Sequence, residues 1–519
     1  MAVKKPLHQL DKRISEHFYA IAIALLGLAC VAVVMFHLIT LTRFPPIFID
    51  ESWYSNVVWN WLTTGENADT LHSGMPVTLR WPYLGNLPLL LSFALFDLGF
   101  FQARLVSWLF GVLLLLLTFI AGRQSFIALT GGLAALLLAL SPVYAQASHY
   151  ARPDIFLAAT GMLSFILVNH AIKYDRIWVH FIAGLIIGVS IDIHQNALLY
   201  AMGLSAIYLY TYRKSVLRQT ATWMFVAGGL VGVSYYLIVS ILPNLGDTLN
   251  FYRFSFVNSH PIPVMSLNPI VLLESALDEI GRYKFLDNSL DFVLIGASIV
   301  YLLIRRQKAD MVYLVFVGTV FSSFVLLAGN KHDIYAILLY PYFIIMVAEV
   351  FINFIRSTRD NILGYAFVLT VLALTIFSSA YHLARSAQSS RGYNYEAITD
   401  QIKQVIPKDA RVVALPEWWL CMHDYDYKSI LGLSFYNLSN GYNLVEGLEA
   451  LHPDILIVED DLRGLLVDQG YFIANSGFDL YKMPRTEFQD FLSARGEMIL
   501  DFRDDWHGRF QIYSINWDK

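Results

Sequence analysis

The sequence predicts a polytopic α-helical membrane protein with about 11 spans and a C-terminal α/β extracytoplasmic domain. Of the 519 residues, 56% are hydrophobic and only 15% are charged, whereas a soluble protein carries about 25% charged residues. The apolar residues gather in long runs, and a bilayer-spanning helix needs roughly 20 of them. The residues from 383 onward are polar and alternate between helix-like and strand-like patterns, which is typical of a small mixed domain.

The N-terminus predicts a retained first span. Residues 1–17 are polar and basic, and the apolar run 18–41 follows them. A cleaved signal peptide would have a shorter apolar core that ends in small residues at a cleavage site. We therefore expect residues 1–17 to be a cytoplasmic N-terminus.

Ten further runs complete a transmembrane domain over residues 18–382. They are 102–121, 126–143, 155–172, 178–193, 197–210, 221–242, 290–304, 311–328, 334–355 and 362–381. The apolar segment 84–96 is too short to span, so we expect an interfacial helix there.

The distribution of Lys and Arg predicts the orientation. With the N-terminus inside, every short connection on the cytoplasmic side carries basic residues, as the positive-inside rule requires. Segments 44–101, 144–154, 244–289 and 329–333 then lie outside, together with residues 383–519. The protein is thus expected in the plasma membrane with an extracytoplasmic C-terminal domain, built from a helix at 395–405 and strands at 411–415, 455–459 and 510–515.

Charge and cysteine content exclude some functions. The net charge of −5 is small and argues against a nucleic-acid partner. Cys30 and Cys421 are the two cysteines, which are too few for a zinc or disulfide framework.

The first outer loop, 44–101, carries the main candidate site. Asp50 and Glu51 follow the first span directly, and carboxylates so close to hydrocarbon usually have a function or a partner. The alternative is a helix N-cap, with Asp50 at the start of a Trp-rich helix and Glu51 in its first turn.

The second outer loop has a similar arrangement. Arg152 and Asp154 flank Pro153 at the mouth of the next span, and a helix cap is again the alternative. Because both acidic span mouths lie on the outer side, we favour one shared site.

Other polar and aromatic side chains lie at outer positions. They are Trp53, Tyr54, Arg80, Trp81, Tyr83, His149, His194, Lys331 and His332. The simpler interpretation is an aromatic belt and basic groups that reach toward lipid headgroups. Several basic groups beside carboxylates would also suit a lipid phosphate.

These residues resemble motifs of the integral-membrane glycosyltransferases of the GT-C fold. The nearest likeness is to the family-39-like group, which includes relatives of protein O-mannosyltransferases and lipid A aminoarabinose transferases. The acidic pair Asp50-Glu51 with Trp53 and Tyr54, the run RWPYLGNLPLLLSFALFDLGFFQARLVSWLFG, the segment HYARPD and the late run GNKHDIYAILLYPYF carry it. The likeness covers residues 18–355 in order.

The resemblance implies transfer of a hexosyl or pentosyl group from a polyprenyl-phosphate donor to an acceptor hydroxyl, with inversion. The acceptor is a lipid, a glycan or a protein, and membrane lipids are further partners. It makes Asp50 the general base, with Glu51 and Asp154 positioning the acceptor or the base. Arg80, Lys331, His332, Arg152 and His149 are the candidates for the donor phosphate. Trp53, Tyr54, Trp81, Tyr83 and His194 are the candidates for the acceptor or sugar.

Three questions stay open at the level of sequence. Some relatives hold a divalent metal between acidic groups, but one Asp-Glu pair with Asp154 does not establish such a site. A membrane transporter would also be polytopic, although it usually shows internal repeats and mid-membrane charges. A non-catalytic subunit of cell-envelope glycan assembly would use the C-terminal domain as an interaction module.

Overall fold

The computed structural model describes residues 4–71, 83–249, 268–283, 289–327, 333–433, 440–467 and 485–518. Each predicted span overlaps a helix. These helices are α1 (Lys4–Thr40), α4 (Phe100–Ser125), α5 (Ala128–Leu140), α7 (Asp154–Tyr174), α8 (Ile177–Val189), α9 (Ala197–Tyr212), α10 (Thr220–Tyr236), α13 (Ser289–Arg305), α14 (Lys308–Leu327), α15 (Tyr340–Ser357) and α16 (Ile362–Ser389).

The described helices confirm a multi-pass membrane protein. Within the described ranges, seven are long and apolar enough to cross a membrane, or eight if α5 and α6 (Pro142–His149) form one bent span. The bend of 69° falls at Ser141. Pro142 cannot donate a backbone hydrogen bond, and the Ser141 hydroxyl instead accepts one from the Tyr144 amide at 3.1 Å. The count of eleven spans stays a prediction.

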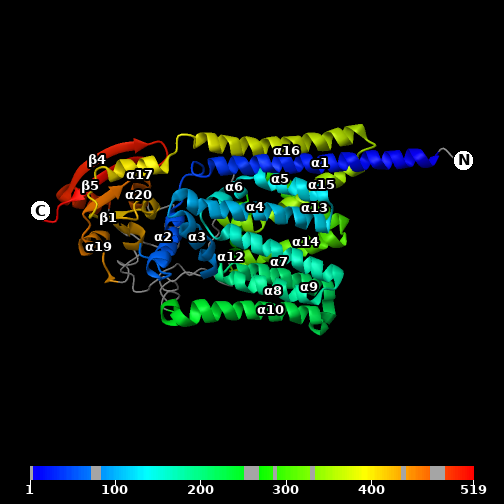
Figure 1. The fold of residues 1–519 in the computed structure, drawn as a ribbon, viewed down its shortest axis with the longest axis horizontal. Coiled ribbons are helices and arrows are strands. Elements are labelled where there is room, and N and C mark those ends of the chain that lie inside the picture. Colours follow the sequence, from blue (N-terminus) through cyan, green and yellow to red (C-terminus); the bar gives the residue numbers. More distant parts are fainter. Residues whose placement is uncertain are drawn as a thin grey trace.

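The span helices lie side by side in one bundle (Figure 1). The N-terminal end of α1 and the C-terminal domain lie at opposite ends of this bundle. The helices α2 (Ile49–Thr64) and α3 (Tyr83–Phe96) lie at the same end as the C-terminal domain. The described parts of the first predicted outer loop and of residues 383–519 therefore share one end of the molecule.

Glycines allow the closest helix pair of the bundle. A Cβ on Gly184 of α8 would collide with the Phe225 carbonyl oxygen, and one on Gly228 of α10 would collide with that of Phe181. Gly188 and Gly232 repeat the pattern one turn later, which is the small-xxx-small arrangement of tightly packed membrane helices.

The C-terminal domain contains a five-stranded mixed sheet in the order β2-β1-β3-β5-β4. Its strands are β1 (Arg411–Ala414), β2 (Asp426–Ser429), β3 (Ile455–Val458), β4 (Gly496–Asp504) and β5 (Gly508–Ile515). Its helices are α17 (Tyr395–Lys403), α19 (Leu444–Leu451), α20 (Asp460–Val467) and α22 (Arg485–Arg495). Strand β1 pairs in parallel with β2 and β3, and β5 pairs antiparallel with β3 and β4.

The sheet domain is docked onto the first outer loop. The Ser52 hydroxyl on α2 donates to the Glu417 carbonyl oxygen at 2.9 Å, and the Tyr395 hydroxyl donates to the same oxygen at 2.6 Å. The Ile47 amide donates to the Tyr393 hydroxyl at 3.1 Å. Ile47 also belongs to the apolar core of the sheet domain, so the loop before α2 and this domain share one core.

Candidate active site

The start of α2 places Asp50 and Glu51. The chain leaves α1 through Pro45 and Pro46, which favour an extended backbone, and Phe48 is the extended N-cap residue of α2. The Glu51 carboxylate accepts from the Phe48 amide at 2.8 Å, as in a capping box. The alternative with Asp50 as the N-cap is therefore wrong: Phe48 is the N-cap residue and Glu51 completes the capping box, which leaves Asp50, the second residue of α2, for other contacts.

Glu51 is fully buried and bound to Arg104 of α4. The Arg104 Nε and Nη2 atoms donate to the two Glu51 carboxylate oxygens at 2.8 and 2.7 Å. The Ala151 amide donates to Glu51 as well, at 2.9 Å. The other N–H groups of Arg104 donate to the carbonyl oxygens of Leu41, Pro45 and Pro46. Arg104 therefore fixes the loop that carries Asp50, and Glu51 has no solvent exposure with which to meet a substrate.

Arg152 links the two acidic span mouths. Its Nη1 forms an ion pair with Asp50, and its Nε donates to Asp154 Oδ2 at 2.8 Å. The Arg152 and Asp154 side chains are only 6% and 3% exposed, whereas that of Asp50 is 26% exposed. The two span mouths thus meet in a carboxylate–guanidinium–carboxylate bridge, and Asp50 is its most exposed member.

Two more side chains complete this bridge. Burial by itself would lower the pKa of Arg152, but Asp154 and a hydrogen bond with Tyr335 outweigh burial and raise it. The Tyr335 hydroxyl lies 3.5 Å from Nε2 of His194. Burial lowers the pKa of His194. The negative charge of Asp154 raises this pKa and the positive charge of Arg152 lowers it, and the net shift is downward. At neutral pH, His194 is therefore an uncharged hydrogen-bonding group, and Arg152 keeps its charge.

A small pocket, partly open to the outside, adjoins Arg152. It lies between α2, α3, α4 and the connection from α6 to α7. Its polar lining comes from Tyr54, Asn86, Ser107 and Arg152, and its other lining residues are Gly85, Leu89, Ala103, Val106, Ala151, Pro153 and Phe156. The Ser107 hydroxyl has no hydrogen-bond partner among the described residues.

The comparisons identify the fold. Residues 81–238 match the family model of dolichyl-phosphate-mannose-protein mannosyltransferases. The structure of ArnT from Cupriavidus metallidurans bound to undecaprenyl phosphate is 14% identical with a TM-score of 0.62, covering 94% of this chain and 97% of that one. This chain has the GT-C fold.

A second GT-C relative supports the same conclusion. The oligosaccharyltransferase AglB from Archaeoglobus fulgidus, in complex with an inhibitory peptide and a dolichol-phosphate, is 12% identical with a TM-score of 0.54, covering 94% of this chain and 74% of that one. A search of curated protein sequences found no match. The chain thus shares its fold with ArnT, and its residues 81–238 are similar to the mannosyltransferase family model, in agreement with the resemblance of its motifs.

Arg282 is a buried cation near this site that the sequence analysis did not single out. Arg282, at the end of α12 (Pro269–Arg282), is 3% exposed and forms an ion pair with Glu279. Its Nε and Nη1 atoms have no hydrogen-bond partner among the described residues. Arg282 also interacts electrostatically with Asp333 and Tyr335, so it lies near the Arg152 bridge. In the sequence, Arg282 is an isolated basic residue of the long predicted outer segment 244–289, with no motif around it that would mark it as a site residue.

The remaining predicted site residues that the structure describes form contacts away from the Arg152 bridge. His149 is fully buried, with Nε2 3.0 Å from Nδ1 of His37 and Nδ1 against the Phe44 carbonyl oxygen, so neither ring nitrogen is left for a phosphate. The Trp53 indole donates to Asp69 at 2.8 Å, and the Tyr83 ring packs edge-on against Trp61. Arg80, Trp81, Lys331 and His332 lie outside the described residues.

The acidic residues of this site do not fit a divalent metal. A metal shared by Asp50 and Asp154 would occupy the place that the Arg152 guanidinium takes between them. Within the described ranges, no group of three or more His, Cys, Asp or Glu side chains could hold a metal ion.

Proposed function

We propose that this chain transfers a sugar from a polyprenyl-phosphate donor to an acceptor hydroxyl, with inversion, at the outer face of the membrane. The ArnT relative is bound to undecaprenyl phosphate, and the AglB relative is bound to a dolichol-phosphate and a peptide. The observation that carries the proposal is Asp50, a partly exposed carboxylate held by buried Arg152 beside the small pocket.

The reaction is a single displacement at the anomeric carbon. The acceptor oxygen forms a bond to that carbon while the bond from the carbon to the phosphate oxygen breaks. Asp50 takes the hydroxyl proton, and the polyprenyl phosphate leaves with the electron pair. Attack from the face opposite the leaving group inverts the configuration.

The remaining side chains support this step. Arg152 fixes the Asp50 carboxylate, and Asp154 fixes Arg152 from the other side. Glu51 acts through Arg104 on the position of the loop, as a positioning residue. The unpaired N–H groups of Arg282 suit the leaving phosphate, together with Arg80, Lys331 and His332 as predicted from the sequence. Tyr54 and His194 would contact the sugar, and His194 would do so as a neutral group.

The test compares two Asp-to-Asn variants in purified, folded protein. Asp50→Asn removes the proposed base, and we expect transfer from a labelled polyprenyl-phosphate sugar to fall by about 10²-fold or more. Asp97→Asn is the matched control, because Asp97 is an exposed turn residue with a φ of 67°, a conformation that Asn adopts readily. Near-normal transfer by Asp50→Asn would remove Asp50 as the base. Solute uptake by liposomes without lipid-linked sugar would instead support a transporter.

A further inference from the structure

A buried acid lies where α3 meets the break between α8 and α9. Helix α8 ends at Val189, and the 3₁₀ turn Ser190–Asp192 follows it. Asp192 is completely buried, and its Oδ2 accepts a hydrogen bond from the Leu84 amide at 2.9 Å. The Tyr83 amide interacts with the same carboxylate. Because the first amides of a helix have no partner within that helix, Asp192 acts as an N-cap of α3 from a distant part of the chain.

A hydroxyl group fixes the other oxygen of this carboxylate. The Ser240 hydroxyl donates to Asp192 Oδ1. Ser240 lies in the π-helical turn Leu237–Ile241, which directly follows α10. Such turns are rare and occur frequently at functional sites. Each oxygen of Asp192 is thus bound, one by the start of α3 and one by the segment after α10.

The turn that carries Asp192 also contacts α3 and the proposed site directly. A Cβ on Gly85 of α3 would lie only 3.1 Å from the Ile193 carbonyl oxygen, so the two backbones are in close contact. The His194 amide donates to the Ser190 carbonyl oxygen at 3.1 Å, which places His194 in the same turn. This turn therefore holds the start of α3 and also carries His194, which would contact the sugar.

Helix α3 forms one wall of the pocket at Arg152. Its residues Gly85, Asn86 and Leu89 line this pocket, and the first two follow directly after the capped amides. Asp50 and Arg152, by contrast, belong to α2 and to the connection from α6 to α7. A displacement of α3 would therefore change the pocket wall and leave the proposed base in its place.

We propose that Asp192 is a positioning residue for the sugar donor. It holds the start of α3, and α3 in turn gives the pocket the shape in which the donor sugar binds. This inference rests on the proposed sugar transfer. The alternative is a cap that contributes to stability alone. The two differ in the affinity for the donor after the carboxylate is removed.

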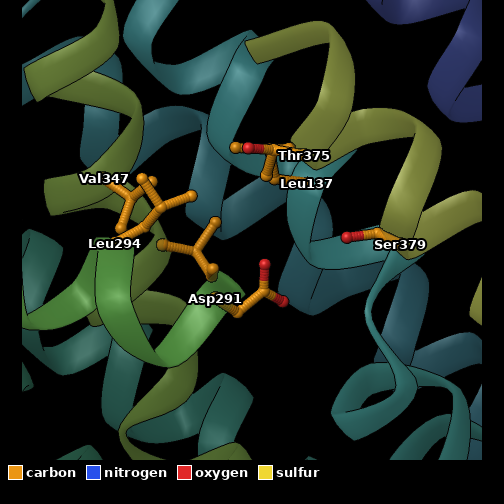
Figure 2. Close-up of a pocket in the computed structure, with 7 residues that line it drawn as sticks. Leu137, Asp291, Leu294, Val347, Thr375 and Ser379 are labelled. Carbon is orange, nitrogen blue, oxygen red and sulfur yellow. The ribbon is translucent and has the colours of Figure 1, made fainter. Parts of the chain in front are cut away.

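A second buried acid provides the matched control. Asp291 lies in the first turn of α13, is 9% exposed, and accepts a hydrogen bond from the Tyr340 hydroxyl at 2.8 Å. It also interacts electrostatically with His382. Figure 2 shows Asp291 among aliphatic and hydroxyl side chains inside the helix bundle. The residues around it include none that line the pocket at Arg152, so its loss should affect stability alone.

The test combines donor kinetics with amide hydrogen exchange in the purified full chain. Asp192→Ala should raise the KM for labelled polyprenyl-phosphate mannose by about ten-fold or more and change kcat by less than about two-fold. The amides of residues 83–89 should exchange faster in this variant, while those of α7 keep their protection. Asp192→Asn should bring the KM back to within about two-fold, because its oxygen accepts from the Leu84 amide and its amide group donates to Ser240.

Asp291→Ala should leave both the donor KM and the exchange of residues 83–89 unchanged. An unchanged donor KM in Asp192→Ala would overturn the inference, and so would an equal rise in Asp291→Ala. A KM as high in Asp192→Asn as in Asp192→Ala would do the same, because the cap would then be intact. If Asp192→Ala does not fold, Ser240→Ala removes one of the two bonds and should give a smaller rise in KM. Absence of transfer by the unmodified chain would remove the proposed function, and the exchange of residues 83–89 would then decide whether Asp192 holds α3.

Discussion

Arg104 holds Glu51 through two parallel hydrogen bonds, and both side chains are completely buried. The same guanidinium binds three carbonyl oxygens of the connection between α1 and α2. The pair therefore connects α4 with the loop that carries the proposed base. Its main effect is on the shape of this loop.

The first prediction concerns the stability of this pair. Glu51→Gln or Arg104→Met should each destabilise the protein by about 3–5 kcal/mol, because each leaves a buried charge or buried carbonyl groups unpaired. The double variant Glu51→Leu/Arg104→Met should not regain full stability, since the three loop carbonyls still lack their donor. Unfolding in detergent measures this. Arg411→Lys, in a pair that is 41% exposed on both sides, is the control and should change stability by no more than about 1 kcal/mol.

The second prediction concerns Arg152. Arg152→Lys keeps a positive charge but lacks the planar group that reaches Asp50 and Asp154 together. We expect kcat for sugar transfer to fall by about ten-fold or more, with little change in the KM for the lipid donor. Steady-state kinetics with both substrates varied would separate these quantities. A kcat within two-fold of the unmodified enzyme would show that the bridge has no role in positioning Asp50.

The third prediction concerns Arg282. Arg282→Gln removes the two unpaired N–H groups that the donor phosphate would use. The KM for the polyprenyl-phosphate sugar should rise by about ten-fold or more, while the KM for the acceptor stays nearly constant. Arg391→Gln changes an exposed residue after α16 and is the matched control. If Arg282→Gln and Arg391→Gln changed the KM for the donor equally, Arg282 would not contribute to donor binding.

The fourth prediction concerns pH and the sheet domain. Burial raises the pKa of Glu459 to about 8, and burial together with Glu459 raises that of Glu417. A carboxyl group with a raised pKa in the folded state favours folding below its unfolded value of 4.5, and this contribution is lost as pH rises toward about 8. Glu459→Gln should therefore melt at a higher temperature than the unmodified chain at pH 9 and show a flatter pH profile.

Tryptophan fluorescence is a suitable measurement for that profile, because the Trp418 indole lies 3.3 Å from Glu459. Glu497→Gln, at an exposed position of β4, should keep the pH dependence of the unmodified chain. A Glu459→Gln profile that still falls between pH 5 and 8 would show that other groups set the pH dependence.

The sequence was sufficient for the helices and for the meeting of two span mouths. An apolar run long enough to span a membrane must form a helix there, because lipid offers no partner for unpaired backbone groups. The positions of Asp50 and Asp154 at span ends then follow from the order and orientation of the spans along the chain. The short strand β2 and the half-exposed strand β4 were not predicted, because neither has the apolar pattern that marked β3.

Partners that are distant in the chain could not be predicted. Nothing local in the sequence connects Glu51 with Arg104, 53 residues later, and Arg104 appeared only as part of a family-like run. Arg305, at the end of α13, is bound to Asp310 in the first turn of α14 and to Glu349 in the middle of α15. These pairs depend on helix packing, and a single sequence contains no record of which helices pack together.

The docking of the sheet domain has a consequence for how the protein can diverge. Ser52, two residues from Asp50, binds the main-chain oxygen at position 417, and so does Tyr395. Every amino acid supplies that oxygen, so the side chain at 417 can change without loss of either bond. The side chain at this contact can therefore vary while α2, which carries Asp50, keeps its position against the sheet domain.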